Sequence, residues 1–266
     1  MQVRPNRPPP SAQDPVFRTE PAAGVVPANG ADPHRNRLLA ALDDVDWQRW
    51  RPLLEPVELK VGQVLYESGS AIGHACFPTT AIVSLEYLTD NGGSAEIAMV
   101  GNEGMVGIPL FMGDGSTPGR AVVQTAGLAF RMPGPAVRAE FQRSAPVMRL
   151  LLRYTQALIA HMAQTAVCNR HHSVDKQLCR WLLLRLDRES GPELVVTHEQ
   201  IAHGLGVRRE GVTEAALALQ RAGLISYRRG HITVLDRPGL QQRCCECYGV
   251  VKAEYERLLP EHGPGF

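Results

Sequence analysis

The 266-residue sequence lacks long apolar runs, and no uninterrupted stretch approaches the ~20 residues that a membrane-spanning helix requires. The first residues also lack the apolar core of a secretion signal. Aromatic residues are scarce at 6%, yet the apolar share of 44% is typical of a globular protein with ordinary cores. We therefore expect a cytoplasmic protein with no membrane partner and room for two domains.

Catalytic motifs are also missing. No nucleophile and base, phosphate-cradling glycine loop or pair of carboxylates stands at a usable spacing, so we expect neither an enzyme nor a cofactor. The net charge of +1 shows no overall excess of either sign. Because DNA binding needs a local basic face rather than a basic chain, the placement of the arginines is more informative than their total.

Cysteine is sparse, and without an export signal its six residues do not indicate disulfides. Three of them lie in Cys244-Cys245-Glu246-Cys247, which can supply half of a tetrahedral metal site. No second paired motif follows, and Cys244 and Cys247 fall on the apolar stripe of a helix expected from Gly239 to Leu259. We expect core packing and no metal site. The alternative is a thiol-based redox or metal-responsive regulator that uses Cys244, Cys245 and Cys247.

The amino-terminal half of the chain changes character along its length. Residues 1–34 are rich in proline, alanine and glycine without an apolar period, which predicts a disordered tail. Short helices are expected near Arg35–Leu42 and Trp47–Leu54. Glycine-punctuated alternation then predicts a small β-roll, with strands over 57–59, 64–66, 75–77, 81–88, 94–100, 120–125 and 128–132.

A long helix is predicted next. Ser144 is a suitable N-cap and Pro146 suits the first turn, where a missing N–H costs nothing. The helix should reach about Asn169, and Cys168 and His171-His172 then mark a capped junction with a further helix over 173–188. The apolar stripe of the long helix has nearly coiled-coil spacing, and it packs either on the protein's own core or on a second subunit. The stripe comprises Val147, Leu151, Tyr154, Leu158, Met162 and Thr165.

Residues 197–235 predict a helix-turn-helix followed by a hairpin wing. Thr197-His198-Glu199-Gln200 has the pattern of a capping box, and Gly206 ends that first helix at a tight turn. A second helix follows from Arg208 to Leu219 with an apolar stripe at helical spacing. Two alternating strands then flank Arg228-Arg229-Gly230, which predicts the hairpin turn of the wing. This arrangement indicates binding to double-stranded DNA.

The exposed face of the second helix carries the candidate DNA contacts. Arginine forks match the acceptors of guanine, and a glutamate can accept from cytosine, so Arg209 and Glu210 are the expected base readers. Glu214 lies on the same face. Phosphate contacts are expected from Arg208, Thr213, Arg228 and Arg229.

The stretch from Leu205 to Thr213 resembles the turn and recognition helix of the Crp-Fnr transcription regulators, named for the cyclic-AMP receptor protein and the fumarate-nitrate regulator. The resemblance extends from about Leu38 to Leu235. It implies an α+β protein with a jelly-roll β sensor domain over 35–143, a dimerisation helix over 144–170 and a winged helix-turn-helix DNA-binding domain with a carboxyl-terminal helix over 171–266.

The same resemblance implies a sequence-specific regulator that works with RNA polymerase as a homodimer. The seam would then be the stripe Leu151, Tyr154, Leu158 and Met162, pairing with the same helix of a second subunit. Two-fold symmetry would present two recognition helices roughly 34 Å apart to a near-palindromic operator.

Three departures from the family pattern are informative. Glu214 stands where the cyclic-AMP receptor protein has another base-reading arginine, so a different operator is expected. Ile108 replaces the acid that holds the ribose in cyclic-nucleotide binders, so an unknown small-molecule effector other than cyclic AMP is expected, with Arg120, Gly107 and Ile108 as candidate contacts. For Arg120, the alternative is a loop arginine beside Asp114. The cysteine group that holds an iron-sulfur cluster near the amino terminus of the oxygen-sensing branch is missing.

Overall fold

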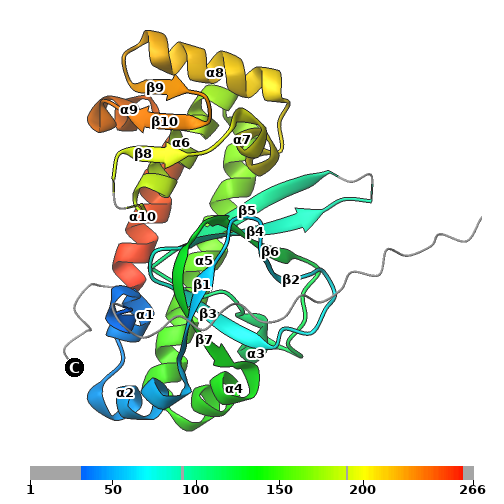
Figure 1. The fold of residues 1–266 in the computed structure, drawn as a ribbon, viewed down its shortest axis with the longest axis vertical. Helices are drawn as coiled ribbons and strands as arrows, with labels where there is room; N and C mark the ends of the chain where they lie inside the picture. The colour runs from blue at the N-terminus through cyan, green and yellow to red at the C-terminus, as the bar shows by residue number, and fades with distance from the viewer. Residues whose placement is uncertain (1–30, 91–92, 190, 260–266) are drawn as a thin grey trace, which may run out of the picture.

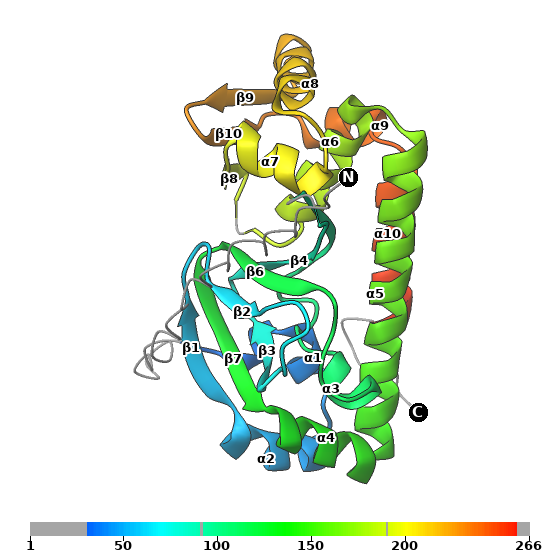
Figure 2. The same ribbon diagram turned by 90° about the vertical axis from the view of Figure 1, so that its right-hand side faces the viewer.

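The computed structural model describes residues 31–259 with the exception of 91, 92 and 190. The tail expected over 1–34 therefore lies almost wholly outside the described residues, and within them Pro33–Arg35 form a 3-10 turn, η1. Figure 1 shows a β-rich body at one end of the molecule and a smaller helical head at the other, and the two views together show the long helix α5 running beside the body toward the head (Figures 1 and 2). The expected α+β class is confirmed.

Two antiparallel sheets form the β-rich body. One sheet has the order β1 (Glu55–Leu59), β7 (Gly127–Pro133), β3 (His74–Pro78), and the other has the order β2 (Val64–Tyr66), β6 (Arg120–Thr125), β4 (Ile82–Leu88), β5 (Ser94–Val100). All seven expected strands are present. Their inward side chains make the core of the roll, for example Val57, Phe77, Val83 and Val123.

Short helices close the ends of the roll. These are α1 (Arg37–Ala40), α2 (Asp44–Trp50), the 3-10 turn η2 (Arg51–Leu53), α3 (Pro109–Met112) and α4 (Gly134–Arg143). The sequence reading missed α4, because its start at Pro133-Gly134-Pro135 has the composition of a loop and no side chain caps it. Proline in a first helical turn forfeits no hydrogen bond, so the helix tolerates this start.

Helix α5 spans Ala145–His171, and Ser144 Oγ accepts from the backbone N–H of Val147 at 3.4 Å, as its N-cap role predicts. The predicted apolar stripe packs inside this chain: Leu151, Tyr154 and Leu158 are fully buried. Tyr154 Oη also donates to Met105 O at 2.7 Å. The expectation that this stripe is the subunit seam is therefore wrong, because the roll and a carboxyl-terminal helix already cover it.

A different face of α5 is exposed. Its exposed large apolar side chains are Met148, Leu152, Ile159 and Val167. Figure 2 shows α5 along one edge of the molecule, with the β-roll on one side of it. None of the described helices has the length and apolar character needed to cross a membrane.

The head contains α6 (Val174–Leu186), α7 (His198–Leu205), α8 (Arg209–Arg221) and a three-stranded sheet with the order β8 (Glu193–Val195), β10 (His231–Val234), β9 (Ile225–Arg228). The hairpin of β9 and β10 is the predicted wing. Strand β8 was not predicted, because three residues carry too short an alternation to be recognised.

The prediction of a single helix from Gly239 to Leu259 is wrong. The chain forms α9 (Arg237–Arg243) and α10 (Cys247–Leu258), separated by a break in which Cys244 has extended backbone. The two segments bury their apolar residues against different partners: α9 packs on α6, whereas α10 runs back along α5. One straight helix cannot satisfy both partners, so the chain turns at the cysteine motif.

Candidate DNA-binding surface

The two helices of the predicted helix-turn-helix are held by local hydrogen bonds. Thr197 Oγ1 accepts from the Gln200 N–H at 3.2 Å, and Gln200 Oε1 accepts from the Thr197 N–H at 2.8 Å, which completes the capping box. Helix α7 ends at Gly206, whose φ of 64° is left-handed and favours glycine. The Val207 N–H then donates to Ala202 O at 3.0 Å, which closes the turn before α8.

Helix α8 has one buried and one exposed face. Val212, Ala215, Ala216 and Leu219 are buried, as the sequence predicts. The candidate base-reading and phosphate-binding residues Arg208, Arg209, Glu210 and Glu214 are exposed, and Thr213 is half-buried. The helix lies at the outer end of the head in both views (Figures 1 and 2), where a long partner can reach it.

Arg209 is well placed to contact a partner. Its side chain is 67% exposed, and its nearest ion-pair partner is the equally exposed Glu199, with an Nε to Oε2 distance of 3.9 Å. An exposed pair at that distance contributes little free energy, so the guanidinium can exchange Glu199 for a base or a phosphate. Thr213 is more constrained, because its hydroxyl donates to Arg209 O at 3.0 Å.

His198 joins the recognition helix to the wing. Its Nδ1 lies 3.1 Å from Thr213 Oγ1 on α8, and its ring stacks on Tyr227 of β9 with centroids 4.0 Å apart. Burial, with a smaller effect from the charge of Arg209, lowers the pKa of His198, so the ring stays neutral at physiological pH. These contacts hold α7, α8 and the wing as one unit.

The wing turns sharply at its two arginines. Arg228 pairs with His231, so Arg229 and Gly230 are the two central residues of the turn, with φ of 42° and 88°. Positive φ at both positions is the pattern of a type I′ hairpin turn. Arg228 and Arg229 are both exposed at this tip. The fold therefore places two positive charges at the end of the wing, beside the head surface that carries α8.

The candidate effector residues have other partners. Arg120, at the start of β6, donates from Nε and Nη2 to Glu86 Oε2 at 3.0 and 2.9 Å, and Glu86 is buried. The alternative of a loop arginine beside Asp114 is wrong, because Arg120 is part of the sheet. Gly107 has a φ of 112° and packs so closely that a Cβ would lie 3.3 Å from Ala75 Cα. Ile108 is half-buried at the N-cap of α3.

The head docks on the roll through polar groups that the sequence reading missed. Trp181 Nε1 of α6 donates to Glu96 Oε1 of β5 at 3.1 Å, and Arg188 pairs with the buried Glu103 at 2.6 Å. Burial raises the pKa of Glu96, although Ser84 and Arg185 oppose that shift. No sequence signal marks these pairs, because Glu96 and Trp181 are 85 positions apart.

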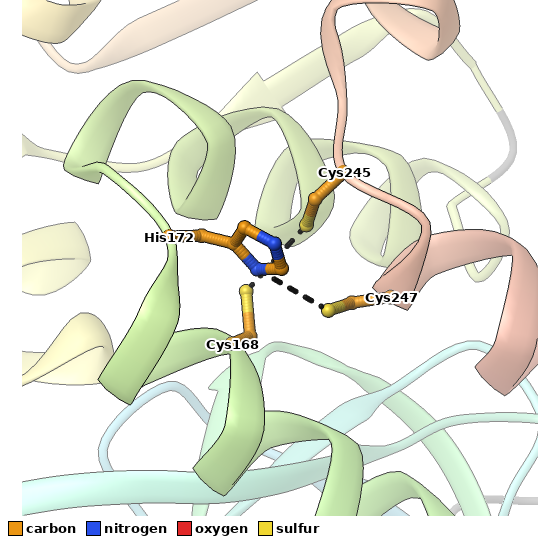
Figure 3. A group of neighbouring side chains, drawn as sticks. All are labelled: Cys168, His172, Cys245 and Cys247. Atoms are coloured by element: carbon orange, nitrogen blue, oxygen red, sulfur yellow. Dashed lines mark hydrogen bonds between the residues drawn. The ribbon is translucent and has the colours of Figure 1, made fainter.

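The cysteine motif lies at the carboxyl-terminal end of α5. Cys245 and Cys247 approach Cys168 and His172, the residues that the sequence predicts as a helix junction (Figure 3), while Cys244 is half-buried beside them. Thiol hydrogen bonds from Cys168 and Cys244 lower the pKa of Cys245, and the same bonds raise the pKa of Cys168 and of Cys244. The sequence reading missed this grouping because its two halves are distant along the chain.

Residues 176–243 match the family model of a Crp-like helix-turn-helix domain. Similar solved structures include a Crp/Fnr-family transcriptional regulator from Eubacterium rectale, with 21% identity, a TM-score of 0.62 and coverage of 77% of this chain and 96% of that one. FixK2 from Bradyrhizobium japonicum has 15% identity, a TM-score of 0.62 and coverage of 72% and 98%. A CRP/FNR-family regulator from Thermus thermophilus, TTHA1359, has 23% identity, a TM-score of 0.59 and coverage of 71% and 97%.

A comparison with curated protein sequences returned no match. At these identities the structural likeness shows the fold alone, a β-roll joined by a long helix to a winged helix-turn-helix head. The match over 176–243 independently identifies the head as Crp-like. The resemblance to Crp-Fnr regulators that the turn and recognition helix carry in the sequence is confirmed.

Proposed function

We propose that this chain is a sequence-specific transcription regulator of the Crp-Fnr type that binds a near-palindromic operator as a homodimer. The observation that carries the proposal is the exposed first turn of α8. It presents Arg209 and Glu210 at the outer end of a capped helix-turn-helix within a Crp-like domain. The division into a roll over 35–143, a helix over 144–170 and a head over 171–266 is part of the proposal.

Each exposed group has a role in this proposal. Arg209 reads a guanine through two of its N–H donors, and Glu210 accepts from a cytosine. Arg208 and the two wing arginines contact phosphates, which are sequence-independent anchors. Thr213 adds a weaker phosphate contact because its hydroxyl already donates within the helix. Glu214 disfavours contact with a phosphate or a guanine at its position, which restricts the set of operator sequences that the protein binds.

The proposed dimer uses the exposed face of α5. Leu152, Ile159 and Ala166 recur every seven residues on this face, which is the spacing of a coiled-coil seam. Met148 and Val167 extend the apolar surface toward both ends. A second copy of α5 covers this face, and two-fold symmetry then places the recognition helices roughly 34 Å apart.

The roll is the proposed sensor, and its effector is a small molecule other than cyclic AMP. Ile108 cannot accept a hydrogen bond from a ribose hydroxyl, and Arg120 is already paired with the buried Glu86. An anionic effector would have to displace that carboxylate. The proposal includes the cytoplasm as location, RNA polymerase as a partner on DNA and no catalytic activity.

Selection of random duplexes with the full-length protein tests the proposal. We expect enrichment of a two-fold symmetric sequence, and Arg209→Ala should relax one base position in each half-site. Arg221→Ala is a matched control, because it removes the same charge from the last turn of α8. Recovery of unrelated sequences would contradict the proposal. It would also be contradicted if Arg209→Ala and Arg221→Ala weakened binding equally, on specific and on random duplex alike.

A further inference from the structure

Four potential metal ligands meet where α5 ends and α10 begins (Figure 3). Cys168 lies in the last turn of α5, and His172 is the residue that caps it. Cys245 lies in the break between α9 and α10, and Cys247 is the first residue of α10. The three sulfur atoms and one imidazole nitrogen all lie within 4.8 Å of one another.

These separations are close to those around a single tetrahedral ion. Zinc lies about 2.3 Å from sulfur and about 2.0–2.1 Å from nitrogen, so neighbouring ligands are about 3.8 Å apart for two sulfurs and about 3.5 Å apart for sulfur and nitrogen. In the protein, Cys168 Sγ is 3.7 Å from Cys245 Sγ, and Cys247 Sγ is 3.4 Å from His172 Nδ1. The donor atoms therefore stand near the corners of one coordination sphere.

The surroundings orient the ligands. His172 Nε2 lies 3.4 Å from Glu246 Oε1, which leaves Nδ1 directed at the sulfurs. A carboxylate on the far nitrogen is the usual support of a metal-bound histidine. Gln164 Nε2 donates to Cys247 Sγ at 3.1 Å, so this sulfur also has an external donor.

Apolar packing accounts poorly for this cluster. Its buried members among the described residues are Cys168, Cys245 and Cys247, with Cys244 beside them, and the group is separate from the main core. A set of thiols that touch mainly one another gains little from burial compared with the leucines of the main core. Cys247 therefore lies in a cluster separate from the main core, whereas Cys244 packs against the main core as the sequence predicts.

We propose that Cys168, His172, Cys245 and Cys247 bind one Zn²⁺ as a closed structural site. Thiolate and imidazole ligands suit Zn²⁺, and four protein ligands leave no open position for catalysis. The spacing is Cys-x3-His at the end of α5 and Cys-x-Cys at the helix break, and Cys168 and Cys245 are 77 positions apart. Positions i and i+4 share one helix face, which is why the first pair can act together.

The ion would join the end of α5 to the start of α10. Helix α6 begins at Val174, two residues after His172, so the site stands at the junction between the long helix and the head. Because the ligand pairs come together only when the chain folds, metal binding contributes to folding stability. This inference concerns metal binding and stability, and it does not depend on the proposed DNA-binding function.

Metal analysis of the purified full-length chain tests the assignment. We expect about one zinc per chain, and at least a tenfold lower content in Cys168→Ser and in Cys245→Ser. Cys244→Ser is the matched control, because it removes the adjacent thiol and should retain zinc. Cys179→Ser, another buried cysteine, is a second control. Loss of zinc from Cys244→Ser but not from Cys245→Ser would overturn the ligand set.

Further variants separate a lost ligand from a failure to fold. His172→Cys should retain zinc as a four-thiolate site, whereas His172→Ala should release it with unchanged circular dichroism. Glu246→Gln should weaken zinc affinity about tenfold, since it removes only the support of His172.

Chelator-treated wild type titrated with cobalt chloride should give the intense visible bands of a tetrahedral thiolate complex. Failure to bind zinc or cobalt, or a Cys168–Cys245 disulfide in fresh protein, would overturn the proposal.

Discussion

Two adjacent residues of α5 separate the protein's own core from the proposed dimer seam. Leu158 is 0% exposed and Ile159 is 53% exposed. Truncating a buried leucine costs about 2–5 kcal/mol of stability, and an aspartate there adds an unpaired buried charge. Since most domains have only about 5–15 kcal/mol of stability, Leu158→Asp should unfold the protein or lower its Tm severely.

Ile159 should instead affect assembly. Full burial of an isoleucine side chain is worth about 1.5–3 kcal/mol, so the exposed half leaves about 1 kcal/mol for each copy to gain in a dimer. Ile159→Ala should therefore weaken dimerisation by about 2 kcal/mol, roughly thirtyfold, with little change in the monomer. Ile159→Asp should weaken it further, because the charge would lie in an apolar interface.

Sedimentation, thermal melts and gel shifts distinguish these outcomes. We expect Ile159→Asp to be a folded monomer that binds half-sites and loses the coupling between the halves of the operator. Leu158→Asp should be unfolded, or have a severely lowered Tm, in the thermal melt, so that its mass in sedimentation would not report on the dimer seam. A folded Leu158→Asp with an unchanged Tm would contradict the assignment of Leu158 to the chain's own core, and a dimeric Ile159→Asp would place the seam elsewhere.

Other measurements test separate parts of the account. Arg209→Ala should cost about 1–3 kcal/mol at the cognate operator in gel shifts, with Arg221→Ala nearly unchanged; equal losses on random duplex would refute base reading. Cyclic AMP should leave operator affinity and Tm unchanged, because Ile108 offers no ribose partner, and a clear calorimetric titration at micromolar nucleotide would refute this. Burial raises the pKa of Glu96, so its stabilising effect is present at acidic pH and is lost as pH rises through that pKa. Glu96→Gln, which can still accept from Trp181, should raise the Tm at pH 7 relative to wild type and not at pH 4; the opposite trend would refute the pKa direction.

Sequence reasoning succeeded where the physical cause is local. The capping box at Thr197, the left-handed Gly206 and the hairpin turn at Arg229 each depend on residues only a few positions apart. The strands of the roll likewise follow from alternation and glycine turns. The helix-turn-helix, the wing hairpin and the succession of strands in the roll were therefore predictable before any tertiary contact was known.

Sequence reasoning failed where two distant segments compete or cooperate. Helix α5 has apolar residues on two faces, and its period alone does not tell which face the roll covers. The helix break at Cys244 arises because α9 and α10 have different packing partners. The pairing of Arg120 with Glu86, and of Cys168 with Cys245, joins residues that no local pattern connects.

The most direct test of the central claim is the operator recovered by the full-length protein from random duplexes. The account predicts two inverted half-sites with centres about one helical turn, or a small multiple of it, apart, and a loss of that symmetry in Ile159→Asp. A selection that yields single, unpaired half-sites with wild-type protein, or no enriched sequence at all, would contradict it.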